Sequence, residues 1–204
     1  MKKLTKNWTL EKALPWLLLV GGVIGVICSL VLTYDQIKIW VNPHYVPVCN
    51  LNPIVNCASV INSNEGHILG IPGPFFGLLA FPVLATLGVV LLSGAKLKRW
   101  IWVGLEGGAI GGVVFALWLF WLSLYRIHAL CPFCLTVDVV IYTLFWYITL
   151  YNLRAGHIRM PTALKSVERF MFKYQFDLLL LWLLILAGIT LKHFWYFYGP
   201  KLGF

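Results

Sequence analysis

Five long apolar segments, separated by shorter polar ones, account for most of the 204-residue chain. They cover residues 14–37, 75–92, 100–125, 131–153 and 177–198. A helix needs about 20 consecutive apolar residues to cross the hydrocarbon core of a bilayer. The pattern therefore predicts an all-α polytopic membrane protein with five transmembrane helices. Glycines in the first segment, Gly21, Gly22 and Gly25, allow close contact with a neighbouring helix.

The polar segments divide the chain into two parts. Five prolines interrupt residues 38–74, so we expect turns and one short helix there rather than a span. Residues 93–99 form a tight basic turn, and residues 154–175 form a basic linker. We expect a four-helix domain with its long loop over residues 1–153. The linker, the fifth helix and a short tail follow over residues 154–204.

The composition supports the membrane interpretation. Hydrophobic residues make up 60% of the chain and charged residues 11%, whereas a soluble domain carries about 25% charged residues. The net charge of +9 could suggest nucleic acid, but the basic residues lie between apolar segments rather than in one patch. No nucleic-acid partner is therefore expected. The first apolar segment is long and lacks a clear small-residue cleavage site, which favours a retained helix over a signal peptide.

The distribution of positive charge predicts the orientation in the membrane. With the N-terminus in the cytosol, 12 of the 16 Lys and Arg residues fall on the cytosolic side. They are Lys2, Lys3, Lys6, Lys12, Lys96, Lys98, Arg99, Arg154, Arg159, Lys165, Arg169 and Lys173. The predicted topology is N-in and C-out.

This topology places four of the five cysteines on the outer side. Cys49 and Cys57 lie in the long loop, and Cys131 and Cys134 lie at the start of the fourth helix. Disulfides form and persist outside the cytosol, where the cytosolic thiol pool does not reduce them. Cys28 lies within the first helix and is interpreted as a core residue.

The sequence Cys131-Pro132-Phe133-Cys134 has the spacing of a redox-active pair. Pro132 suits the first position of a helix, which makes Cys131 the expected N-cap and puts Cys134 in the first turn. The positive end of the helix dipole favours a thiolate there. A structural disulfide and one half of a metal site are the alternatives that the spacing leaves open.

The loop pair, Cys49 and Cys57, has two interpretations. It can close a proline-rich loop as a structural disulfide. It can also exchange electrons with soluble thiols and pass them to the pair at the helix start. Zinc held by all four cysteines is a third arrangement, but only one half has the short spacing of such sites. No metal site is therefore expected.

Three further positions are candidates for chemistry. Asp138 follows Cys134 by four residues, on the same helix face, and can move protons or hydrogen-bond within the bundle. Phe75 and Phe76 can wall a flat ring or anchor the helix at the membrane interface. Glu106 lies near the cytosolic end of the third helix and is interpreted as a packing or interfacial residue.

The chain carries the loop pair Cys49 and Cys57, then Ser63, and then a CxxC at the outer start of a later helix. The order of these residues resembles that of the vitamin K epoxide reductase family. The resemblance covers residues 14–153. It implies a four-helix bundle around a quinone, with residues 1–153 as the catalytic domain. It also implies that Cys134 and Ser63 lie near the quinone, that Cys131 exchanges with Cys57, and that Cys49 meets an external thiol.

The resemblance implies an enzyme, a membrane thiol:quinone oxidoreductase that supports disulfide bond formation. Its cofactor would be ubiquinone or menaquinone, and its partner a thioredoxin-like protein of the DsbA type on the outer side. A bacterial inner membrane, with its lipid and quinone pool, is the expected location. The alternatives are a quinone or epoxide reductase that runs on thiols, and a structural or transport protein with stapling disulfides.

The sequence departs from the vertebrate pattern at two places. Thr136-Val137-Asp138 stands where those enzymes have a threonine-tyrosine pair, and Ile71-Pro72-Gly73-Pro74 stands where they carry an asparagine. Vitamin K recycling is therefore not expected. The fifth helix resembles bacterial members, many of which carry a thioredoxin-like domain after it. The partner here is expected either as a separate chain or as a fused domain beyond this sequence.

Overall fold

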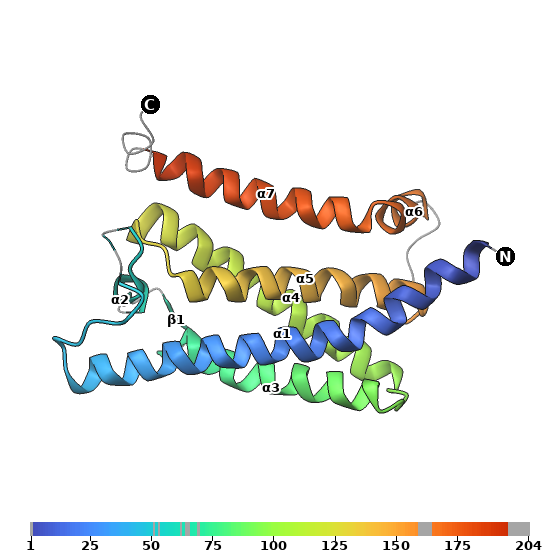
Figure 1. Ribbon diagram of the computed structural model, residues 1–204, viewed down its shortest axis with the longest axis horizontal. Helices are drawn as coiled ribbons and strands as arrows, with labels where there is room; N and C mark the ends of the chain where they lie inside the picture. Colours follow the sequence, from blue (N-terminus) through green and yellow to red (C-terminus); the bar gives the residue numbers. More distant parts are fainter. Residues whose placement is uncertain are drawn as a thin grey trace.

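The structure is a computed structural model that describes residues 2–50, 52, 54–61, 63, 66–68, 70–158 and 165–195. Side chains are described from residue 10 onward, apart from those of His67 and Ile68. Figure 1 shows the long helices running side by side, with the last of them lying along the others.

Helices dominate the described chain. The long ones are α1 (Lys2–Val41), α3 (Gly73–Leu92), α4 (Arg99–Leu122), α5 (Pro132–Arg154) and α7 (Gln175–His193). The short ones are α2 (Cys57–Ile61), α6 (Lys165–Lys173) and a π-helical turn, η2 (Ser123–Ile127), that continues α4. Two residue pairs, β1 (His67–Ile68) and β2 (Ile71–Pro72), form a small antiparallel hairpin.

Five of the described helical segments are long and apolar enough to cross a membrane: Leu10–Val41, Gly73–Leu92, Arg99–Ile127, Pro132–Arg154 and Gln175–His193. The prediction of an all-α polytopic membrane protein is confirmed. The first span is longer than the sequence pattern indicated, and the third includes η2. The predicted fifth span reached residue 198, and residues 196–198 lie outside the described part. Within the predicted linker, residues 165–173 are helical.

Glycines decide how closely the first helices approach. A Cβ atom added at Gly22 would lie 2.6 Å from the backbone nitrogen of Ala85, and one at Gly88 would lie 2.6 Å from that of Leu19. Gly25 accommodates the ring of Phe81. The predicted close contact is confirmed, since α1 packs tightly along α3. Helix α5 packs against both α1 and α4.

The glycines of α4 have different surroundings. A Cβ atom added at Gly104, Gly107, Gly108 or Gly111 would meet no other atom within 4 Å. In the described part of the chain, no helix therefore packs closely on the face of α4 that carries these glycines.

A buried polar cluster joins α4 to α5 at the end where α1 begins. The Glu106 carboxylate accepts hydrogen bonds from Thr149 Oγ1 at 2.7 Å and from Asn152 Nδ2 at 2.9 Å. Asn152 Oδ1 lies 3.2 Å from His157 Nδ1. The ring of Trp102 stacks on that of His157 and is tilted against that of Tyr151. Glu106 is therefore a packing residue, as the sequence indicated.

Helix α7 contacts the bundle near both ends and also in its middle, where Trp182 lies edge-on to Tyr142 of α5. Gln175 O accepts a hydrogen bond from Trp146 Nε1 at 2.8 Å. At the other end Phe194 is fully buried among Ile54, Leu124 and Leu130. Figure 1 shows this second end of α7 at the same end of the molecule as α2.

Candidate functional site

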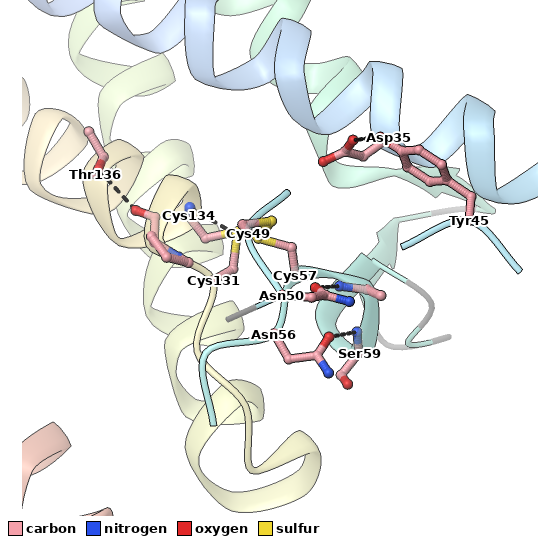
Figure 2. Close-up of a disulfide and its surroundings, with 12 residues drawn as sticks. Asp35, Tyr45, Cys49, Asn50, Asn56, Cys57, Ser59, Cys131, Cys134 and Thr136 are labelled. Atoms are coloured by element: carbon pink, nitrogen blue, oxygen red, sulfur yellow. Dashed lines mark hydrogen bonds between the residues drawn. A yellow bond between two sulfur atoms is a disulfide. The ribbon is translucent and has the colours of Figure 1, made fainter. Parts of the chain in front are cut away.

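The four cysteines of the two predicted pairs meet at one end of the bundle, called the cysteine end below (Figure 2). Cys49 and Cys57 form a disulfide, whereas Cys131 and Cys134 are free thiols. The Cys131 sulfur lies 3.4 Å from that of Cys57. The two pairs are thus in direct contact through Cys57 and Cys131. Cys28 is a buried free thiol on α1.

Backbone hydrogen bonds hold Cys57 and Cys131 together. Val55 and Leu130, which precede the two cysteines, form a parallel β-bridge. Leu130 N–H donates to Ile54 O at 2.7 Å, and Asn56 N–H donates to Leu130 O at 3.0 Å. The Asn56 side chain then caps α2 by accepting from Ser59 N–H at 3.0 Å. This pairing, called the backbone clamp below, sets the spacing between the loop cysteine and the CxxC.

Cys131 is the N-cap of α5, as predicted, with Pro132 at the first helical position. Its sulfur accepts a hydrogen bond from Cys134 N–H at 3.3 Å. A hydrogen bond from the Cys134 side chain lowers the pKa of Cys131, and the backbone N–H groups of Cys134 and Phe133 add to this effect. Burial of Cys131 opposes them. The net effect favours the thiolate, which is the nucleophile in disulfide exchange.

A cavity of about 510 Å³ extends from the cysteine end between α1, α3, α4 and α5. Cys134 and Asp138 of α5 line it at the cysteine end, and Trp100 and Ile101 line it near the start of α4. Most of the lining side chains are aliphatic or aromatic. The polar side chains among them are few: Ser29, Gln36, Trp100, Cys134 and Asp138. The cavity is therefore a long apolar chamber in which Gln36, Cys134 and Asp138 are the polar lining residues at the cysteine end.

The structure brings only some of the predicted cofactor-binding residues to this cavity. Cys134, Asp138 and Phe76 line it. Ser63 is not among the lining residues, and its hydroxyl donates to Val60 O at 2.7 Å. Phe75 also lies outside the lining and stacks on Trp40, with ring centroids 6.4 Å apart.

Two lining residues were missed by reasoning from the sequence. Ser29 and Gln36 lie on one face of α1 and are 3% and 2% exposed. The signal was present, because Ser29, Thr33 and Gln36 recur at helical spacing within an otherwise apolar segment. Polar residues that repeat on one face of a membrane helix indicate a face turned toward the protein interior.

The cavity suits a hydrophobic quinone. Gly104 and Gly108 line it and an added Cβ atom would find open space at either position, so the wall of α4 is kept clear. A flat ring needs polar groups near its carbonyl oxygens, and an isoprenoid tail needs an apolar channel. The residues present meet both requirements. In the described part of the chain, no group of three or more His, Cys, Asp or Glu side chains could hold a metal ion.

Comparison with known proteins gives an independent result. No curated protein matches the chain. The family model described as "Vitamin K epoxide reductase family" matches residues 16–149, which run from α1 into α5 and include all four cysteines of the site. Because this match covers well over half of the sequence, the protein belongs to the vitamin K epoxide reductase family and is a multi-pass membrane oxidoreductase.

Proposed function

We propose that this protein oxidises thiols on the outer side of a bacterial inner membrane and passes the electrons to a quinone. One observation carries the proposal. The Cys131 sulfur lies 3.4 Å from a sulfur of the Cys49–Cys57 disulfide, while its neighbour Cys134 lines an apolar cavity. Two thiol pairs in contact, one of them at the cavity wall, form a continuous path for electrons.

The thiol steps balance as two exchanges. A reduced dithiol partner attacks Cys49 of the loop disulfide, leaves as a disulfide, and gives its two electrons to Cys49 and Cys57. The Cys57 thiolate then attacks Cys131 of an oxidised CxxC, and Cys134 departs as a thiolate. Cys49 attacks Cys57, which reforms the loop disulfide and releases Cys131. The loop disulfide with two free CxxC thiols is the product of these steps.

Cys134 and Asp138 serve the cavity side of the reaction. A quinone bound there supplies the terminal acceptor, because it takes up two electrons and two protons. Closing the Cys131–Cys134 disulfide releases both electrons and both thiol protons. Asp138 lines the cavity four residues beyond Cys134 and can carry one of these protons. The apolar walls exclude water and orient the ring and tail. Ubiquinone and menaquinone both meet this description.

The remaining features assign a side and a partner. The excess of Lys and Arg in the segments away from the cysteine end supports an N-in, C-out orientation. The partner is then an outer-side, thioredoxin-like protein of the DsbA type, which oxidises folding proteins. Residues 1–153 form the catalytic domain with its loop over 38–74, and residues 154–204 carry the linker, the accessory fifth helix and the tail.

An anaerobic assay with purified protein tests the proposal. Wild type should couple oxidation of a reduced thioredoxin-like protein to quinone reduction with a stoichiometry of one to one. A protein whose cysteines form only structural disulfides would not couple thiol oxidation to quinone reduction, and that result would refute the proposal. Net flow from quinol to disulfide would instead support the reverse reductase.

Trapping tests the exchange itself. In Cys134→Ser the Cys131 thiolate can attack Cys57 of the loop disulfide and release Cys49 as a thiolate, and no second CxxC thiol can then resolve the product. A Cys57–Cys131 disulfide should therefore accumulate and be seen as a crosslinked peptide after proteolysis. Cys28→Ser is the matched control, since Cys28 lies on α1 outside the proposed relay, and it should give no such product. Absence of the crosslink in Cys134→Ser would count against the path through Cys57.

A further inference from the structure

We propose that Gln36 of α1 is the side chain that hydrogen-bonds the quinone headgroup in this protein. The inference rests on the proposed function and adds to it a binding residue on a helix that carries no cysteine of the relay. It comes from the burial of the Gln36 side chain, from its position, and from an Oε1 atom that has no hydrogen-bond partner among the described residues.

The Gln36 side chain is buried and incompletely paired. It is 2% exposed, and in the described part of the chain its Oε1 atom has no hydrogen-bond partner. The adjacent Asp35 is similarly buried but accepts a hydrogen bond from Tyr45 OH at 3.0 Å (Figure 2). Buried polar groups are nearly always paired, because leaving one unpaired costs free energy. A hydrogen-bond donor on a ligand in the cavity would supply the missing partner of Gln36 Oε1.

The position of Gln36 identifies that partner. It lines the cavity within the last two turns of α1, at the end where Cys134 and Asp138 of α5 line the same cavity. A group reduced by Cys134 must lie at this end, and its polar atoms must be satisfied there. Ser29, the other polar lining residue of α1, is two turns deeper and fits into the space left by Gly77.

The chemistry of a carboxamide suits both redox states of the ligand. A quinone carbonyl oxygen only accepts hydrogen bonds, whereas a quinol hydroxyl also donates one. Glutamine offers two N–H donors and a carbonyl acceptor, so rotation of the amide can match either state. Gln36 can therefore hold the ring before and after reduction without a change of charge in the membrane interior.

Calorimetric titration of the detergent-solubilised, fully oxidised protein tests this role, because both cysteine pairs are then disulfides that cannot react with the ring. Dimethylnaphthoquinone serves as the ligand, and dimethylnaphthalene serves as the same ring system without carbonyl groups. Gln36→Met removes the amide and keeps the length of the side chain. Thr33→Val is the matched control, since Thr33 is also buried with an unpaired Oγ1 but does not line the cavity.

Gln36→Met should weaken binding of the quinone by about three- to ten-fold, the loss that follows from one neutral hydrogen bond. It should leave binding of the hydrocarbon unchanged, and Thr33→Val should alter neither. Equal quinone affinity in Gln36→Met and wild type, or equal weakening for both ligands, would overturn the inference and leave the proposed function intact. A wild type that binds no quinone would overturn both.

A second variant covers the case in which Gln36→Met lowers the thermal unfolding midpoint. Gln36→Glu keeps the size of the side chain, but its carboxyl group donates to a quinone carbonyl only when protonated. Quinone binding by Gln36→Glu should therefore weaken as pH rises, whereas binding by wild type should not. A binding constant of Gln36→Glu that matches wild type at every pH would count against the inference.

Discussion

The two ends of the bundle both contain buried polar groups, but these groups differ in how completely they are hydrogen-bonded. Away from the cysteines, both oxygens of the Glu106 carboxylate accept hydrogen bonds, and Asn152 pairs with its neighbours through both ends of its amide. At the cysteine end, Gln36 lines the cavity, and its buried Oε1 atom has no hydrogen-bond partner in the described part of the chain.

The difference separates structure from function. A polar cluster whose members satisfy one another stabilises the contact between two helices and has nothing left to offer a ligand. Polar atoms that face an apolar cavity without partners are available to a molecule that enters it. Substitutions in the two regions should therefore have opposite signatures, one on stability and the other on turnover.

The largest effect is expected at Asp138, if its carboxyl group carries a proton during turnover. Asp138→Asn keeps the shape and removes the acid, so turnover with saturating quinone should fall by about 100-fold, the range of general acid–base catalysis. The thermal unfolding midpoint should stay close to that of wild type. If the variant turned over like wild type, or if its loss of turnover were matched by a loss of stability, Asp138 would be a structural residue like Glu106. The two regions would then not differ in the way described above.

Glu106 should show the reverse. Glu106→Ala leaves the donors of Thr149 and Asn152 unpaired, so the free energy of unfolding should fall by about 1–3 kcal/mol. Denaturant titration in detergent measures this loss, with Glu168→Ala, at a half-buried position of α6 outside this cluster, as the control. The protein that remains folded should turn over within about two-fold of wild type. A selective loss of turnover would mean that this cluster takes part in the reaction.

The smallest effect concerns the pKa of Cys131. In a background with serine at Cys28, Cys49 and Cys57, adding Cys134→Ala removes the thiol that hydrogen-bonds Cys131. The pKa of Cys131, which that hydrogen bond lowers, should then rise, so the thiolate forms at higher pH and less of it is present at neutral pH. Ultraviolet absorbance of the thiolate against pH reports the shift. If the titration midpoint of Cys131 stayed the same or fell, the lowered pKa of Cys131 would be due to the end of the helix alone and not to the Cys134 thiol.

The spans and the helix start at Cys131 could be predicted from the sequence because local physics determines them. A membrane helix must be long, apolar and internally hydrogen-bonded, and Pro132 marks a first helical position. The length of α1 and the π-helical turn before His128 were not anticipated. At His128 the chain adopts a left-handed conformation (φ 56°) before it enters α5, and the preceding apolar pattern carries no sign of that reversal.

The cavity could not be predicted, because it depends on which faces pack. The glycines of α1 and those of α4 look alike in the sequence, yet Gly22 touches the backbone of α3 while Gly108 borders open space. In the same way, the sequence shows a polar Gln36 in an apolar segment but not that its face of α1 lines the cavity at the end where Cys134 lies. Residue type alone did not distinguish Phe76, which lines the cavity, from Phe75, which stacks on Trp40.

The backbone clamp has a kinetic consequence. Because Val55 and Leu130 are tied by main-chain hydrogen bonds, Cys57 and Cys131 meet without a diffusive search. A flexible tether gives effective concentrations in the millimolar range, whereas well-oriented groups can reach about 10⁵ M. Small soluble thiols would then compete poorly with Cys57 for Cys131. The backbone clamp thus favours disulfide exchange of the CxxC with the loop pair over exchange with soluble thiols.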